Sequence, residues 1–137
     1  MTSRYLISHP VINKESYFDT DKVKAALIPL DGDITILNES VDKIIDFTFS
    51  DSSLLYSLPL NPYCTFVLSI SSTTSETDIN LLASRLYRLH TSSYKRVLYG
   101  NVILFGSQDP LDPYSKHQYH SLPYEMIEQL YLLAKQR

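Results

Sequence analysis

The chain has 137 residues, of which 44% are hydrophobic and 20% charged, and it carries a net charge of −3. That length and this ordinary globular composition predict a single folded domain over residues 1–137 and exclude a chain that is disordered as a whole. The negative net charge argues against a protein whose main role is to bind nucleic acid, because such proteins usually carry a surplus of lysine and arginine.

Residues 1–15 contain one arginine and a short apolar run that His9 and Pro10 interrupt, so they lack the long apolar region of a secretory signal. No stretch approaches the roughly 18 apolar residues of a membrane span. Cys64 is the single cysteine, which excludes an intramolecular disulfide and a cysteine-based zinc site and fits a reducing compartment. The expected location is the cytoplasm, or also the nucleus, with no membrane partner.

The first clear local signal is a β-hairpin at residues 24–38. Two apolar runs flank Asp31 and Gly32, a pair that is favoured in tight turns because it tolerates positive φ. Beyond the turn, polar and apolar residues alternate over residues 33–36, as in a half-buried strand. Pro29 cannot donate to a strand ladder, so it is expected at an edge or a bulge.

Two further strands are expected before the first helix. Residues 41–51 place Ile45, Phe47 and Phe49 at alternate positions, which predicts a half-buried strand. Residues 63–71 form a β-branched and aromatic run between a proline and a group of hydroxyl residues, which predicts a central, well-buried strand. The segment between these two runs is ambiguous.

A helix is predicted over about residues 75–91. Ser75 or Thr77 can cap the free N–H groups of its first turn, and the acidic residues beside them suit the positive end of the helix dipole. Apolar residues recur at helical spacing on one face of this segment: Ile79, Leu82, Ala83, Leu86 and Leu89.

The last part of the chain predicts a strand, a loop and a second helix. Residues 94–106 have a strand pattern with a bulge or bend at Gly100. A polar loop follows at residues 107–120, and a second helix is expected at about residues 122–135, with Pro123 in its first turn. This order predicts an α+β domain in which two main helices cover an antiparallel or mixed sheet.

The hydroxyl residues 71–77 are the first candidates for chemistry. A nucleophilic Ser or Thr needs a base and an oxyanion hole, and neither a GxSxG nor an SxxK motif surrounds these residues. His90 would lie about 20 Å away along the predicted helix. Glu76 and Asp78 would repel a phosphate at the helix N-terminus. The hydroxyl residues are therefore interpreted as the start of a helix, with ligand binding as the alternative.

The glycine content disfavours a nucleotide-binding fold. Phosphate-binding loops need glycines close together, so that backbone N–H groups can approach the ligand. The three glycines are Gly32, Gly100 and Gly106, and neither a GxGxxG nor a GxxxxGK[ST] motif occurs. No cofactor is expected.

The loop at residues 107–120 holds possible metal ligands: Asp109, Asp112, His117 and His120. Two histidines in an HxxH pair could bind one metal ion on a helical turn. However, the segment is loop-like, no glutamate base follows either histidine, and aspartate before proline is a common turn former. No metal site is assigned. Tyr114, Tyr119 and Tyr124 favour contact with a partner, because tyrosine is enriched at interfaces, although packing on the edge of their own sheet is equally compatible.

Basic and aromatic residues are interleaved along the first predicted helix and the strand after it. Such a pattern can bind single-stranded nucleic acid, but the charges are few and the chain is acidic, so a solvated face or a protein-binding patch is favoured. No catalytic, cofactor-binding or metal-binding residue is assigned. The candidate partner-binding residues are Arg85, Arg88, Tyr94, Lys95, Arg96, Tyr99, Tyr114 and Tyr119.

A family resemblance is carried by the segment TDINLLASRLYRLHTSSYKRVLYGNV, residues 77–102. A threonine-rich approach leads into a helix with an LAxRLxR core, and a short polar turn, a strand and a C-terminal helix follow. The residues that match the core are Leu82, Ala83, Arg85, Leu86 and Arg88. This arrangement resembles the proteasome assembly chaperone family, in particular the fourth chaperone of that series, over roughly residues 65–105 and the position of the final helix.

The resemblance implies a non-enzymatic subunit that pairs with a related small chaperone and binds α-type subunits of the 20S proteasome during early ring assembly. One alternative is a scaffold subunit of another eukaryotic complex, such as a roadblock- or longin-like trafficking or signalling module. Those modules usually begin with a helix or place one between their early strands, so a run of strands before the first helix favours the chaperone. A small metal-dependent hydrolase is the second alternative.

Overall fold

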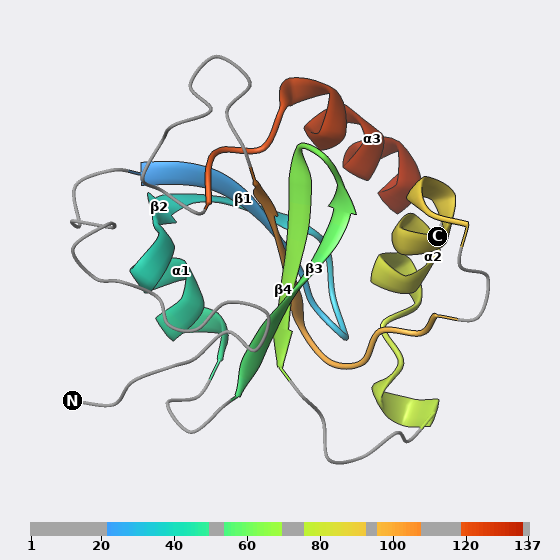
Figure 1. Ribbon diagram of the computed structural model, residues 1–137. Helices are drawn as coiled ribbons and strands as arrows, with labels where there is room; N and C mark the ends of the chain where they lie inside the picture. Colours follow the sequence, from blue (N-terminus) through green and yellow to red (C-terminus); the bar gives the residue numbers. More distant parts are fainter. Residues whose placement is uncertain (1–21, 50–53, 70–75, 93–95, 108–118, 136–137) are drawn as a thin grey trace.

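The computed structural model describes residues 22–49, 54–69, 76–92, 96–107 and 119–135. These residues form a five-stranded antiparallel sheet, with one helix on one face and two helices on the other (Figure 1). The predicted α+β class is confirmed. The helices number three in the described residues, where the sequence predicted two main ones.

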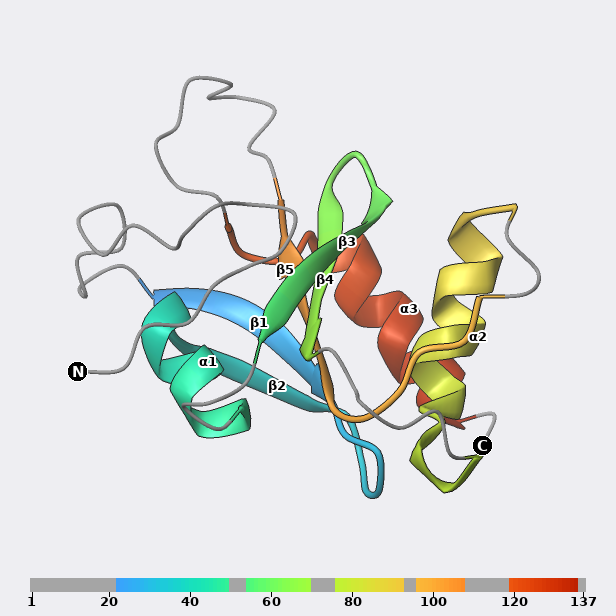
Figure 2. The ribbon, with the colours of Figure 1, turned by 60° about the horizontal axis from the view of Figure 1, so that its bottom comes forward.

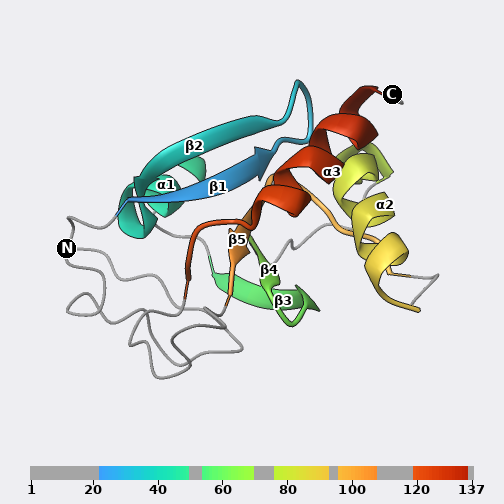
Figure 3. The same ribbon diagram turned by 90° about the horizontal axis from the view of Figure 1, so that it is seen from above.

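The last strand in the sequence occupies the middle of the sheet. The strand order is β2-β1-β5-β4-β3, so the hairpins β1–β2 and β3–β4 lie on either side of β5 (Figure 3). The elements in chain order are β1 (Lys22–Ile28), β2 (Thr35–Ser40), α1 (Val41–Thr48), β3 (Leu55–Asn61), β4 (Cys64–Ser69), the 3-10 turn η2 (Glu76–Asp78), α2 (Leu81–His90), β5 (Val102–Gly106) and α3 (Tyr124–Lys135).

The predicted first hairpin is present as β1 and β2. Gly32 has a φ of 107°, a left-handed value that glycine adopts without strain, and the strands pair from Leu27 opposite Thr35 to Lys22 opposite Ser40. Pro29 lies directly after β1, so it belongs to the turn and needs neither an edge nor a bulge.

Residues 41–48 of the segment predicted as a strand at residues 41–51 form helix α1 instead, so the prediction is wrong there, and residues 50 and 51 lie outside the described residues. Ser40 caps the helix, because its side-chain oxygen accepts a hydrogen bond from the N–H of Lys43 at 3.4 Å. Val41, Ile44 and Ile45 are buried at helical spacing, whereas Phe47 is exposed. The hydrophobic residues of this segment fit both the alternation of a strand and the 3.6-residue period of a helix. The capping serine and the burial of positions 41, 44 and 45 favour the helix.

Helix α2 begins later than predicted. Residues 76–78 form the 3-10 turn, and the cap is Asn80 in place of Ser75 or Thr77, with Ser75 outside the described residues. The strand that follows is also shorter than predicted, since β5 starts at Val102. The chain between them turns at Gly100, whose φ is 76°.

A short strap, residues 119–122, joins β5 to β1. Strand β1 pairs with β5 only from Ala26 to Ile28. Beyond that, Gly106 and His120 exchange two backbone hydrogen bonds of 2.8 and 2.7 Å, and the N–H of Leu122 donates to the carbonyl of Lys24 at 2.9 Å. The strap therefore ties the two strands where they no longer pair directly, and it positions the start of α3.

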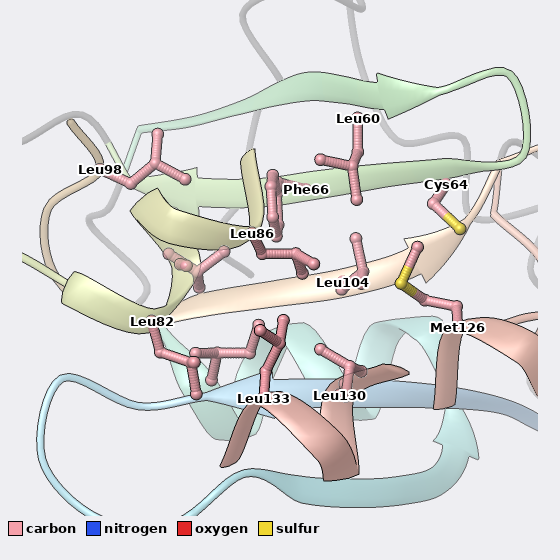
Figure 4. Close-up of a cluster of buried hydrophobic side chains, with 14 of the residues drawn as sticks. Leu60, Cys64, Phe66, Leu82, Leu86, Leu98, Leu104, Met126, Leu130 and Leu133 are labelled. Atoms are coloured by element: carbon pink, nitrogen blue, oxygen red, sulfur yellow. The ribbon is translucent and has the colours of Figure 1, made fainter. Parts of the chain in front are cut away.

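Two hydrophobic clusters fill the two faces of the sheet. The larger one lies between the sheet and helices α2 and α3, where Phe66, Leu86 and Leu130 are fully buried (Figure 4). The smaller one lies under α1 and includes Val67 and Phe105. Burial of each large apolar side chain contributes about 1.5–3 kcal/mol. No helix in the described residues is long and apolar enough to cross a membrane.

Candidate protein-contact surface

The outward sides of α2 and α3 expose large apolar side chains. Leu81 and Leu89 on α2 are 72% and 58% exposed, although they lie two helical turns apart on a helix whose inner side is fully packed. The corresponding residues of α3 are Tyr124, Tyr131 and Leu132. The two helices lie side by side in all three views (Figures 1, 2 and 3). We call these five residues the α2/α3 outer set. Exposed aromatic and leucine side chains on neighbouring helices favour a protein-contact surface.

Two arginines accompany the outer set on α2. Arg85 is exposed and stands four residues from both Leu81 and Leu89, so it lies in the same stripe. Arg88 is also exposed, and its Nε donates to the carbonyl of Ser84 at 3.2 Å, which holds the stem of the side chain along the helix. The stripe thus combines leucine with arginine, a residue that is enriched at interfaces.

The LAxRLxR core divides between the inside and the outside of the protein. Leu82, Ala83 and Leu86 are buried against the sheet, so they pack the helix and cannot meet a partner. Only Arg85 and Arg88 face solvent. Any partner contact made by this motif therefore depends on its two arginines.

Helix α3 presents a second stripe, formed by Tyr124, Glu128 and Tyr131. A side-chain hydrogen bond to Glu128, together with the charge of that carboxylate, raises the pKa of the exposed Tyr124. Tyr124 and Glu128 therefore interact with each other on the exposed side of α3. The sequence pattern contained a signal for this stripe, because Tyr124, Tyr131 and Leu132 fall outside the apolar stripe that predicts the buried side of α3.

A histidine links the two helices to the β3–β4 turn. His90 Nε2 lies 2.8 Å from Gln129 Oε1 on α3, and its Nδ1 lies 3.3 Å from Asn61 Nδ2. Asn61 Oδ1 accepts from the N–H of Tyr63 at 2.8 Å, which turns its amide nitrogen toward the histidine. His90 therefore accepts at Nδ1 and donates from Nε2, as inferred from this network. The link holds the C-terminal end of α2 beside α3.

Two buried polar residues hold the other end of α2. Asn80 Oδ1 accepts from the N–H of Ala83 at 3.1 Å, and its Nδ2 donates to the carbonyls of Ile28 and Gly100, each at 2.9 Å. Ser84 Oγ accepts from the N–H of Leu98 at 2.8 Å. These bonds connect α2, the end of β1 and the chain around residue 100. No local pattern could reveal the two carbonyl contacts of Asn80, because Ile28 and Gly100 are distant in the chain.

The remaining candidate partner-binding residues are dispersed. Arg96 is exposed, but Tyr99 is half-buried in a bridge with Ile79. Tyr119 is buried, with its ring 4.8 Å from that of Phe105, so the expectation that it contacts a partner does not hold in this fold. Tyr94, Lys95 and Tyr114 lie outside the described residues.

The candidates for chemistry fall in different parts of the chain. Asp109, Asp112 and His117 lie outside the described residues, and His120 belongs to the bridge with Gly106. Among the described residues, no three side chains of His, Cys, Asp or Glu form a group that could hold a metal ion. Burial raises the pKa of Cys64 to about 11, so its thiol stays protonated and packs as a small core group.

No protein-family model, curated protein or solved structure matches this chain. The function is therefore argued from the geometry of the surface and from the resemblance of its α2 segment.

Proposed function

We propose that the protein is an assembly chaperone subunit without enzymatic activity, which pairs with a related small chaperone and binds α subunits of the 20S proteasome during early assembly of the α ring. The cytoplasm, or also the nucleus, is the expected location. The observation that supports the proposal most directly is the α2 stripe, in which Leu81, Arg85 and Leu89 stand exposed on the helix that carries the LAxRLxR resemblance.

Binding at such a surface would be dominated by a few side chains. Arginine and tyrosine are frequent anchors of protein interfaces, and truncation of an anchor typically costs 2 kcal/mol or more. Arg85 and Arg88 would provide charge recognition, and the exposed leucines and tyrosines would provide apolar area. A chaperone of this kind works by differential binding, because it stabilises one arrangement of its clients over the competing ones.

The scaffold alternative gains one observation. Helix α1 lies between β2 and β3, whereas the sequence predicted an uninterrupted run of strands before the first helix. A helix between the early strands was the feature expected of roadblock- or longin-like modules, so the element order no longer favours the chaperone over them. The α2 segment remains the argument for the chaperone.

A pull-down of the tagged full chain at native expression, followed by mass spectrometry, separates the two functions. The chaperone proposal expects one small partner together with precursor α subunits of the proteasome. Recovery of trafficking or signalling subunits without α subunits would reject it in favour of the scaffold.

The contact surface is tested in the same experiment with the double variant Arg85→Glu/Arg88→Glu. We expect it to lose at least about nine-tenths of the recovered α subunits, which corresponds to about 1.4 kcal/mol. Asp46→Arg, a charge reversal at an exposed position of α1 on the opposite face of the sheet, is the control and should bind as the wild type does. Far-ultraviolet circular dichroism checks that each variant is folded. Undiminished recovery with a folded double variant would show that the two arginines are only a solvated surface.

A further inference from the structure

The two edges of the sheet differ in their ability to accept another strand. On β3, Pro59 has no N–H to donate, and the register shifts between Pro59 and Asn61. Strand β2 contains no proline and pairs with β1 in unbroken register from Thr35 to Ser40. Within the described ranges, no strand pairs with the outer side of β2. Strand β2 therefore presents a regular row of N–H and C=O groups, and β3 does not.

The side chains of β2 leave room for a neighbour on both faces. Ile36 packs on the edge of the cluster under α2 and α3, and Leu37 packs on the edge of the cluster under α1. Both are only half-buried, because β1 covers them from one side. An added strand would remove the rest of their apolar surface from water.

The charges at the two ends of β2 are complementary. Asp31 and Asp33, both exposed, lie at the turn that precedes β2. Among the residues that the structure describes, the other end carries three lysines and two acids, a net charge of +1: Lys22, Lys24, Lys43, Glu39 and Asp42. In an antiparallel pair of identical strands, the acidic turn of each copy lies beside the lysine-rich end of the other. This complementary charge contact therefore occurs twice in such a pair. It favours a second copy of the chain as the partner that pairs with the edge of β2.

We propose that β2 pairs with β2 of a second copy of this chain around a two-fold axis, which joins the two five-stranded sheets into one continuous sheet. With the axis at Leu37, each Leu37 opposes its own copy and Thr35 opposes Glu39. No like charges meet in this register, and side chains that oppose each other point to the same face. The inference is independent of the proposed function, since it concerns the chain alone.

The test is the oligomeric state of the purified full chain, measured by sedimentation equilibrium over about 1–100 µM. The wild type should approach twice 15.7 kDa as its concentration rises. Ile36→Lys should raise the dissociation constant of the dimer about tenfold or more, because it places a charge in the pairing. Leu58→Lys is the matched control, since Leu58 is also half-buried on the same face of the sheet but lies on β3.

A second variant keeps the test free of folding effects. Asp31→Lys/Asp33→Lys changes two exposed residues in the turn and should weaken the dimer about tenfold, and higher salt should weaken the wild type. A wild type that stays monomeric at about 100 µM overturns the proposal. So does a dimer that Ile36→Lys and the double variant leave intact, or one that Leu58→Lys dissociates equally. A monomer in which the outward-facing β2 amides, those that do not donate to β1, are protected from hydrogen exchange also overturns it and assigns the edge to a segment of the same chain.

Discussion

Asn80 offers the sharpest test of how this fold positions α2. The residue is buried, and its side chain makes three hydrogen bonds, to the N–H of Ala83 and to the carbonyls of Ile28 and Gly100. Asn80→Ala removes the helix cap and leaves two carbonyls without their donor. Each lost bond costs about 0.5–1.5 kcal/mol, so we expect the free energy of unfolding to fall by about 3 kcal/mol.

The assay is unfolding in urea, followed by circular dichroism. With a urea dependence of about 1–3 kcal/mol per molar, a loss of this size lowers the midpoint by about 1–3 M. Asn38→Ala, at an exposed position of β2, is the matched control and should change the free energy of unfolding by less than about 0.5 kcal/mol. A loss below about 1 kcal/mol for Asn80→Ala would refute the argument that these bonds anchor α2.

Asn80→Asp separates the cap from the two donors. It keeps an oxygen for Ala83, but it turns a second carboxylate oxygen toward the carbonyls of Ile28 and Gly100. We therefore expect the charged form to be less stable than the alanine variant. Because burial and the two carbonyls raise the pKa of the new carboxyl above its value of about 3.9 in the unfolded chain, the folded protein binds the proton more tightly. The stability deficit relative to wild type should be largest at pH 7 and shrink toward about pH 4.

Two further predictions concern Gly106 and Cys64. A Cβ at Gly106 would lie 2.2 Å from the backbone oxygen of Ser121, so Gly106→Ala must displace the strap. We expect the free energy of unfolding, measured by thermal unfolding, to fall by about 2–3 kcal/mol. An unchanged midpoint would show that the strap is not packed this closely. Since burial raises the pKa of Cys64 to about 11, only ~0.1% of the thiol is ionised at pH 8, and a thiol reagent should modify the folded protein at least about a hundredfold more slowly than the protein in urea. Equal rates would mean that Cys64 is accessible.

The elements that the sequence predicted well are those with local signals. The hairpin of β1 and β2 follows from Asp31 and Gly32, and α3 follows from a long apolar period that starts at a proline. Helix α1 was missed because eight residues are too few to distinguish the strand period of 2 residues from the helix period of 3.6 residues. The cap that marks its start is Ser40. The start of α2 was predicted too early because Ser75 and Thr77 are favoured cap residues, and Asn80, which caps the helix through Ala83, is a favoured cap as well.

The candidate surface was predictable in part for the same reason. Arg85 and Arg88 are exposed as the helical wheel predicts, but Leu89 was assigned to the buried stripe and lies outside. Leu89 stands at the margin of the apolar arc of α2, four residues after the exposed Arg85, and therefore lies on the exposed side. Tyr119 was expected at a partner because it lies in a polar loop and tyrosine is enriched at interfaces. The strap that draws it against Phe105 is a tertiary feature that no local pattern contains.

The two proposed contact surfaces lie on different parts of the molecule, which matters for the proposed assembly function. Strand β2 is one edge of the sheet, whereas α2 packs beside β3 at the other edge. A strand added to β2 would extend the sheet away from α2, so the outward stripe of Leu81, Arg85 and Leu89 would stay open (Figure 2). One chain could then hold a second subunit through its sheet edge and a client through its helices. Ile36→Lys should consequently weaken self-association and leave client binding intact, and Arg85→Glu/Arg88→Glu should do the reverse.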